Sequence, residues 1–282
     1  MHLLARSLRL AVLTAFLFAA SSQAAILTVD CLDGPFTDIQ DAISAAQSSD
    51  TVLVEACEDA AYSPFSIVGK DDLHVVGNDS PATGTQAGLG GLPRPSLRPP
   101  VTIDGDGGFQ CVVVQNSDGV SIEGLTITNC GFHAIEVLSS FDVTVMRSRI
   151  EGGLESIRDQ GSRRSRYIEN VFVDGLFSIF LDGSEALVAR NLILRDQATG
   201  INVLNEGNHL LGNEIRGSRR EAIIDQGDGS RIERNRCLGN LVDGGQGEIV
   251  LNSGSSNAQV VANVTGDRIA DFGTGTELAG NR

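Results

Sequence analysis

The sequence predicts an all-β solenoid, in which the chain winds into stacked coils, and the spacing of its aliphatic residues is the first evidence. Six aliphatic residues recur every 22 positions, and a seventh follows after 26. In a solenoid no coil can bury its own apolar face, so equivalent residues of successive coils must stack into one core. The six are Val113, Ile135, Ile157, Ile179, Ile201 and Ile223, and the seventh is Ile249.

Two short strands are predicted in each coil. A second inward position lies two residues after the first, which is the period of a strand whose alternate side chains face inward. A further apolar column recurs at steps of 21 or 22 and predicts the other strand. The first set contains Val137, Leu181, Val203 and Leu251, and the second contains Ile150, Phe172, Ile193, Ile215 and Cys237.

An asparagine column accompanies the second strand. Asn170, Asn191, Asn213 and Asn235 each stand two residues before an inward apolar residue. Asparagine tolerates turn conformations, and stacked asparagine side chains can hydrogen-bond to one another. We therefore expect a ladder of asparagines at one corner of the coil.

The segment 36–57 predicts a helix followed by a strand. Ile39, Ala42, Ile43 and Ala46 have helical spacing, and Thr37 is a possible N-cap. Such a helix would cover the end of the core, where bare backbone groups invite pairing with other chains.

The chain resembles the right-handed parallel β-helix proteins of the pectin-lyase-like superfamily. The resemblance runs from Ala25 to about Asn263 and depends on the coil length, the opening segment and the rungs "NVF", "NLI", "NEI" and "NRC". It implies a right-handed parallel β-helix of about nine or ten coils with a short N-terminal capping helix. Leucine-rich, hexapeptide and calcium-binding nonapeptide repeats fit the sequence less well.

Residues 1–24 have the pattern of a secretory signal peptide. Arg6 and Arg9 precede an apolar run, and Ser22-Gln23-Ala24 is a small-residue cleavage pattern. The apolar run is short for a membrane span. We expect a secreted or periplasmic protein that is not an integral membrane protein.

The remaining residues, 25–282, are expected to form a single β-helix domain. Residues 25–58 would be the cap and first coil, and 264–282 a C-terminal tail. Residues 78–100 hold five of the seven prolines, so this segment must leave the sheets as a long loop.

The charge balance argues against polyanionic partners. The chain has 21 basic and 36 acidic residues, and removal of the first 24 residues would leave 19 basic ones, a net charge of about −17. Such a surface disfavours nucleic acid and anionic membranes. Two local arginine clusters are most simply solvated turn residues. They are Arg163, Arg164 and Arg166, and Arg216, Arg219 and Arg220.

Five cysteines leave at least one unpaired in a monomer. A Cys31–Cys57 disulfide would join the helix to the first coil, and an oxidising compartment favours it. Cys111 and Cys130 are nearly one coil apart but belong to different columns, so their pairing stays open. Cys237 occupies an inward position and is expected to be a small buried hydrophobic residue.

The resemblance implies possible action on polysaccharides, but the catalytic motifs of the relatives are absent. Polygalacturonases resemble one another in N-T-D, D-D and H-G motifs, and mannuronan epimerases in D-P-H. N-T-D, H-G and D-P-H do not occur, D-D stands only at Asp71-Asp72 without its companion motifs, and His133 lies in "GFHAIE". We expect neither a cofactor nor a metal site.

One group of chemically active residues remains. Glu136 and Arg158 are 22 residues apart, as are His133 and Glu155, and Asp159 follows. Two adjacent coils would thus hold an imidazole, three carboxylates and a guanidinium, which suffices for acid–base catalysis. The alternative is that opposite charges pair across coils simply to permit parallel stacking.

The tripeptide "DQG" occurs at 159–161 and again at 225–227. Asp followed by Gly is a common exit from a strand, so turn formation explains the repeat better than calcium binding.

Two classes of function remain. The first is a secreted β-helix that binds glycans or acts as a surface scaffold, because the sequence has the complete repeat pattern but no recognisable catalytic signature. The second is a polysaccharide lyase or glycoside hydrolase that uses the face around His133, Glu136 and Arg158, for which the fold analogy is weak support. The sequence does not give the oligomeric state.

Overall fold

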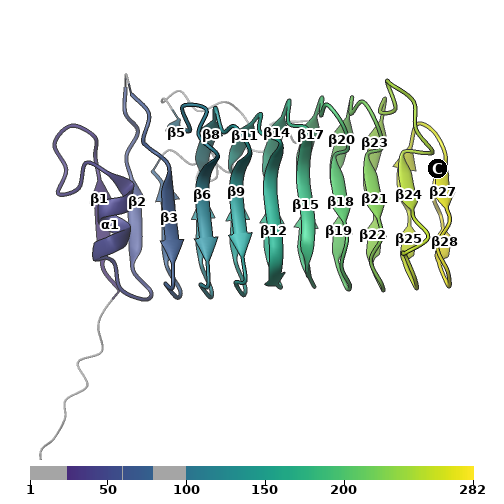
Figure 1. Cartoon of the computed structure of the whole chain (residues 1–282), viewed down its shortest axis with the longest axis horizontal. Helices are drawn as coiled ribbons and strands as arrows, with labels where there is room; N and C mark the ends of the chain where they lie inside the picture. The colour runs from purple at the N-terminus through teal and green to yellow at the C-terminus, as the bar shows by residue number, and fades with distance from the viewer. Residues whose placement is uncertain (1–23, 59, 79–99) are drawn as a thin grey trace, which may run out of the picture.

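The strands of successive coils stack in parallel along one axis, as the sequence predicts (Figure 1). The structure is a computed structural model that describes residues 24–58, 60–78 and 100–282. The solenoid has about 11 coils, slightly more than the nine or ten expected. The predicted signal peptide, apart from Ala24, and residues 79–99 of the predicted loop lie outside the described residues.

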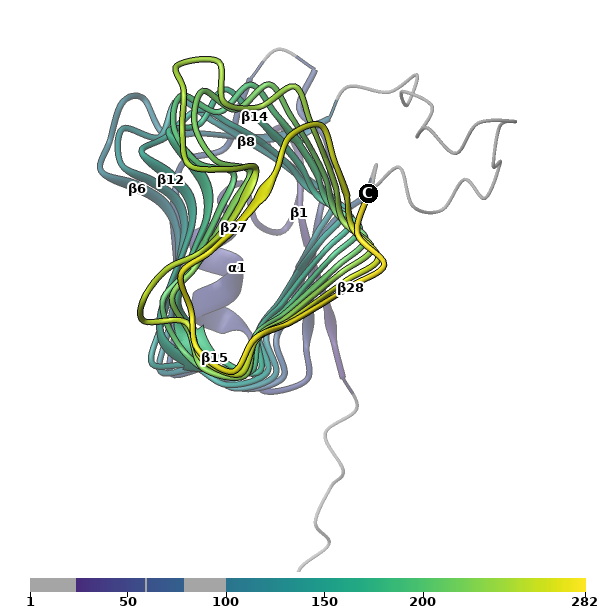
Figure 2. The ribbon, with the colours of Figure 1, turned by 90° about the vertical axis from the view of Figure 1, so that its right-hand side faces the viewer.

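Three parallel sheets form the walls of the solenoid, and a typical coil contributes one strand to each (Figure 2). Sheet A contains β1 (Ile26–Val29), β2 (Thr51–Val54), β4 (His74–Gly77), β7 (Ser121–Glu123), β10 (Thr144–Met146), β13 (Arg166–Ile168), β16 (Leu187–Ala189), β19 (His209–Leu211), β22 (Arg231–Glu233), β25 (Gln259–Val261) and β28 (Glu277–Ala279). Sheet B contains β5 (Val101–Asp104), β8 (Leu125–Thr128), β11 (Arg149–Glu151), β14 (Val171–Val173), β17 (Leu192–Leu194), β20 (Glu214–Arg216), β23 (Arg236–Leu238) and β26 (Val264–Thr265).

Sheet C forms the side opposite the corner between sheets A and B, and it carries the candidate site (Figure 2). Its strands are β3 (Phe65–Val68), β6 (Gln110–Gln115), β9 (His133–Leu138), β12 (Glu155–Arg163), β15 (Phe177–Ser184), β18 (Ile201–Val203), β21 (Ile223–Asp225), β24 (Ile249–Leu251) and β27 (Ile269–Asp271).

The register of sheet C confirms the inward aliphatic column with one correction. Ile135, Ile157 and Ile179 pair across β9, β12 and β15, and all three are fully buried. The residue of β6 that pairs with Ile135 is Val112, whereas Val113 lies opposite Glu136 on the outer face. The step from β6 to β9 is one residue longer than 22, and a slip of one residue moves a strand's side chain to the other face.

The asparagine ladder is present. Asn213 donates from Nδ2 to the carbonyl oxygen of Val188 at 2.8 Å and to Oδ1 of Asn235 at 2.9 Å. Its own Oδ1 accepts from the backbone N–H of Asn191 at 3.0 Å and from Nδ2 of Asn191 at 2.9 Å. The same pattern runs from Asn170 to Asn281, with Asn263 as an additional rung. Each side chain therefore satisfies buried polar groups of two neighbouring coils.

The predicted capping helix is α1 (Ile39–Ala45), which covers the N-terminal end of the core. Ile39, Ala42 and Ile43 are its buried residues. The N-cap is Asp38 rather than Thr37, because the extended backbone at Asp38 lets its carboxylate accept from the N–H of Gln40 at 2.7 Å.

Two disulfides join neighbouring parts of the N-terminal half. Cys31 pairs with Cys57, as predicted, and Cys111 pairs with Cys130, which the sequence left open. Cys237 is free and buried. Two disulfides fit a protein of an extracellular or periplasmic compartment.

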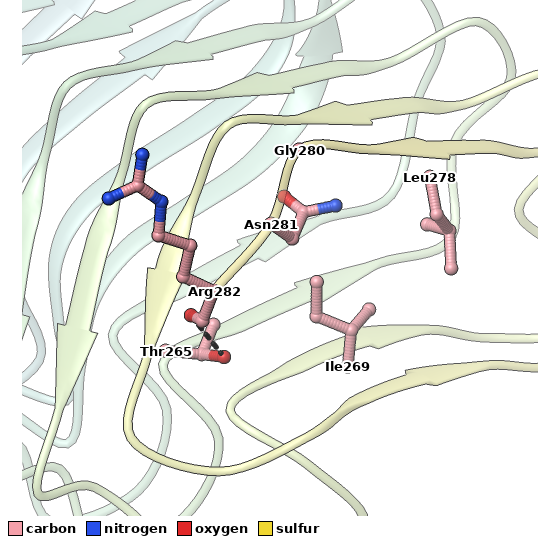
Figure 3. Close-up of a pocket in the computed structure, with 6 residues that line it drawn as sticks. All are labelled: Thr265, Ile269, Leu278, Gly280, Asn281 and Arg282. Atoms are coloured by element: carbon pink, nitrogen blue, oxygen red, sulfur yellow. Dashed lines mark hydrogen bonds between the residues drawn. The ribbon is translucent and has the colours of Figure 1, made fainter.

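The C-terminal segment continues the solenoid. Residues 264–282, set apart as a tail in the sequence, carry β26, β27 and β28 and thereby extend all three sheets. A pocket lies between Ile269, Leu278 and the residues Gly280, Asn281 and Arg282 (Figure 3). The Oγ1 of Thr265 donates to the backbone oxygen of Arg282 there.

Charged residues in the turns pair across coils. Arg164 donates from Nε to Asp142 at 3.0 Å, and Arg195 donates from Nε to Asp174 at 2.9 Å. Arg163, which belongs to the same predicted cluster as Arg164, pairs with Glu185. These partners explain Arg163 and Arg164 without a polyanionic ligand.

Among the described residues, three aspartates have side chains that are completely buried inside the solenoid. The carboxylate of Asp225 accepts from the hydroxyls of Ser230 at 2.7 Å and Ser255 at 2.6 Å. The second "DQG" stands where β21 ends, as expected for a strand exit, whereas the first lies inside β12, which corrects the expectation there. Asp159 is also fully buried. Asp196 accepts from the hydroxyl of Ser178, but its Oδ2 has no hydrogen-bond partner. Burial raises the pKa of all three.

We expect Asn213→Ala to lower the free energy of unfolding by about 2–4 kcal/mol, because it leaves several buried polar groups unsatisfied at once. Asn205→Ala is the control, since Asn205 is exposed and contacts Asp182 outside the ladder. Urea denaturation of both variants measures the difference. Equal losses in the two variants would contradict a special role for the ladder.

Asp196→Asn is expected to stabilise the protein increasingly as pH rises. Burial raises the folded-state pKa of Asp196 well above 3.8, so the folded state binds this proton more tightly than the unfolded state. The wild type therefore loses stability from about pH 4 upward until the pH passes the folded-state pKa. The amide variant lacks this loss, and urea denaturation at several pH values measures it.

Asp174→Asn is the control for this pH series. The Arg195 guanidinium lowers the pKa of Asp174, so its contribution changes only below its ordinary range. Its difference from the wild type should be constant between about pH 5 and 7. A constant difference for Asp196→Asn as well would contradict the raised pKa.

Candidate functional site

Four of the five predicted polar residues gather on the outer face of sheet C. His133 of β9 pairs in register with Glu155 of β12, and Glu136 pairs with Arg158. The register between β9 and β12 skips Ala134 and Ser156, and both are completely buried, like the Ile135 and Ile157 that follow them. The strands therefore bend at this point, and outward side chains on either side of the bend can approach each other.

His133 lies between two carboxylates. Its Nδ1 is 3.2 Å from Oε1 of Glu136, and its Nε2 is 3.1 Å from Oε2 of Glu155. The three residues are only 6%, 7% and 8% exposed. The Nδ1 contact lacks hydrogen-bond geometry, so this nitrogen has no hydrogen-bond partner despite its burial.

Arg158 is enclosed on three sides. Its Nη1 is 3.3 Å from Oε1 of Glu155, and its Nη2 is 3.7 Å from Oδ2 of Asp182. The guanidinium carbon lies 4.3 Å from the centre of the Phe180 ring, in a cation–π contact. Asp182, from the next coil, completes the surroundings of Arg158 and is not among the residues selected from the sequence.

An aromatic pair borders the polar cluster. The rings of Phe109 and Phe132 stack with centres 4.5 Å apart and planes 9° apart, and Phe132 lies 4.5 Å from the His133 ring. Phe109 is 63% exposed. These two residues are 23 positions apart, the same step as Val112 to Ile135, so the longer interval would have identified them.

Gln110 is a further member that the sequence did not suggest. It pairs with His133 in the register of sheet C, and its Nε2 donates to Oε2 of Glu136. The second oxygen of Glu136 is therefore also occupied. We define the sheet C cluster as His133, Glu136, Glu155, Arg158, Asp182 and Gln110, together with the phenylalanines Phe109, Phe132 and Phe180.

Asp159 does not belong to the sheet C cluster. Its side chain points inward, is 0% exposed and accepts a hydrogen bond from the Tyr167 hydroxyl at 2.7 Å. Desolvation by burial is the main cause that raises its pKa. The reason is strand alternation: Arg158 faces outward, so Asp159 joins the inward column of Val137 and Leu181.

The cluster combines acid–base groups with a stacking surface. Two carboxylates, an imidazole and a guanidinium could transfer protons or hold hydroxyl groups. Among the described residues, no group of three His, Cys, Asp or Glu side chains is arranged to hold a metal ion. In the same part of the chain, no helix is both long and apolar enough to cross a membrane.

Comparison with known sequences identifies the repeat region. Residues 101–235 match a family model described as "Right handed beta helix region". No curated protein matches the chain.

Solved structures share the fold at low sequence identity. ORF18 of Geobacillus virus E2 gives a TM-score of 0.62 at 12% identity, over 91% of this chain and 60% of that chain. Pectate lyase Pel9A gives 0.57 at 11% identity, over 86% and 70%. DFA-IIIase from Arthrobacter chlorophenolicus A6, in complex with GF2, gives 0.51 at 12% identity, over 88% and 87%. Such identities show a common fold alone, and the chain spans less than two thirds of the viral protein.

Proposed function

Because the chain folds as a parallel β-solenoid, we propose that it is a secreted protein that binds a glycan on the outer face of sheet C. The predicted signal peptide and the two disulfides support secretion. The named neighbours that act on carbohydrates make a glycan a reasonable ligand, although the common fold by itself does not identify one.

The stacked and exposed Phe109–Phe132 pair is the observation that carries this proposal. An exposed aromatic surface next to polar groups is typical of a binding site. The C–H groups on one face of a sugar ring can pack on phenylalanine, while its hydroxyls reach hydrogen-bonding groups such as Gln110. The order of residues along sheet C thus suits an amphipathic ring.

The solenoid also makes the site elongated along its axis. The cluster draws on β6, β9, β12 and β15, and four adjacent strands extend about 14 Å along the axis. Because each strand is fixed by its neighbours, the side chains are held in one arrangement before a ligand binds. Such preorganisation lowers the entropy cost of binding an extended chain.

Binding explains the polar groups better than catalysis does. Both oxygens of Glu136 and both oxygens of Glu155 already contact partners inside the cluster. A nucleophile or general base needs an oxygen that can reach the reacting atom. A closed network of charges instead fixes side-chain positions around a ligand.

We expect Phe109→Ala to weaken glycan binding by roughly tenfold or more, because it removes the exposed half of the stacking surface. Phe272→Ala is the matched control, since Phe272 is 54% exposed at the C-terminal end and far from β6 along the axis. Titration calorimetry with the glycan that a polysaccharide screen selects measures both affinities.

Two results would contradict the proposed function. One is a screen in which no polysaccharide or oligosaccharide is retained. The other is retention that Phe109→Ala leaves unchanged, because the ligand would then bind elsewhere.

A polysaccharide lyase or glycoside hydrolase is the second candidate. One observation favours it: Glu136 and Glu155 approach opposite nitrogens of one imidazole, and paired carboxylates are the catalytic groups of most glycoside hydrolases. The absent family motifs weigh against it.

The enzyme hypothesis predicts turnover that depends on the cluster. Absorbance of unsaturated ends and release of reducing sugar would be measured over uronate and neutral polysaccharides. Glu136→Gln and Arg158→Ala should each lower the rate at least about 100-fold if these residues act in the reaction. An active preparation whose rate survives both substitutions would place the chemistry elsewhere.

A further inference from the structure

Two acids and an aromatic ring already surround the only arginine of the sheet C cluster. Its guanidinium faces Glu155 at 3.3 Å, Asp182 at 3.7 Å and the Phe180 ring at 4.3 Å. A carboxylate ligand would have to displace one of these acids or share the arginine with both. Recognition of a carboxylate usually depends on an arginine whose donors are available as a fork.

The charge balance of the cluster is acidic. Glu136, Glu155 and Asp182 face one arginine and one histidine, so at least one negative charge is not compensated. A uronate polymer would add a carboxylate with every sugar to this face. Repulsion between like charges in a partly buried site is costly.

Two arginines close to the cluster in sequence are already paired with acids. Arg163 pairs with Glu185, and Arg164 pairs with Asp142. The whole chain carries a net charge of −15, so its long-range field also repels polyanions. The surroundings of the cluster therefore also disfavour anionic ligands.

Two buried polar atoms on the same face lack hydrogen-bond partners. They are Nδ1 of His133 and Oδ1 of Asn202. Asn202 pairs with Phe180 in the register of sheet C, so the two atoms lie on either side of Arg158 and Phe180 along the sheet. Unsatisfied buried polar atoms require an explanation, and ligand hydroxyls, which both donate and accept, would satisfy either atom.

On the glycan-binding function proposed above, we infer that the ligand is an uncharged glycan and that the acids around Arg158 exclude uronate polymers. The stacking surface of Phe109 and Phe132 supplies affinity through the apolar faces of the sugar. The unpaired atoms and Gln110 supply hydrogen bonds to hydroxyls. Specificity against uronates comes from repulsive carboxylates, a device by which binding sites reject a competing ligand.

The test compares oligosaccharides that differ only in charge. Oligogalactan is matched with oligogalacturonate, and oligomannan with oligomannuronate, in titration calorimetry at about 0.01 M and about 1 M salt. At least one neutral ligand should bind with an affinity that salt changes little, and Phe109→Ala should weaken it roughly tenfold. The uronates should not bind at either salt concentration.

A gain of binding isolates the role of the acids. Asp182→Asn keeps the shape of the side chain but removes one acid from Arg158, so uronate binding should appear at low salt and disappear at high salt. Asp142→Asn is the matched control. It releases Arg164, which lies 3.9 Å from the Phe141 ring in the same kind of contact but outside the cluster.

The outcomes separate the two proposals. Wild-type binding of a uronate that Phe109→Ala weakens would overturn the uncharged ligand while supporting glycan binding on sheet C. Equal uronate binding by Asp182→Asn and Asp142→Asn would overturn exclusion by Asp182. Binding of no oligosaccharide of either charge would overturn the glycan-binding function itself.

Discussion

Parallel pairing between successive coils is the interaction on which the rest of the structure depends. It brings residues that are 21 to 23 positions apart in the chain to about 4.8 Å in space. A column of identical side chains is favourable inside, where aliphatic groups and asparagines stack. On the outside it would place like charges together, and the chain avoids this with opposite charges in adjacent coils, as at Asp142 and Arg164.

The interior uses polar groups in two different ways. In the asparagine ladder each amide both donates and accepts, so the column satisfies itself over several coils. A carboxylate only accepts, and a buried one depends on nearby hydroxyls. Asp225 finds two serines, whereas Asp196 retains one oxygen without a partner. Buried carboxylates at different places in a repetitive fold can therefore differ greatly in electrostatic cost.

The outer face of sheet C differs from the other charged surfaces because several aromatic rings border a continuous network of charged groups. Turn ion pairs such as Arg195 with Asp174 are exposed and isolated. Around His133 the charged groups are mostly buried, contact one another in a continuous network and end at an exposed phenylalanine. On the glycan-binding function proposed above, a rigid sheet that fixes such a network would exclude ligands of the wrong charge.

The sequence by itself determined the solenoid, the inward columns, the asparagine ladder and the proximity of His133, Glu136, Glu155 and Arg158, because each follows from a repeat close to 22 residues. Only the tertiary structure decided the effect of the longer step between β6 and β9, which is one residue more than the repeat. It placed Val112 rather than Val113 in the core and brought Phe109 onto Phe132.

Side-chain direction was the other property that the folded chain decided. Asp159 adjoins Arg158 in the sequence but faces the core, because neighbouring residues of a strand point to opposite sides. Asp182 joined the cluster from the next coil. A constant spacing reports which residues stack, whereas the register and the bends of each strand decide which atoms meet.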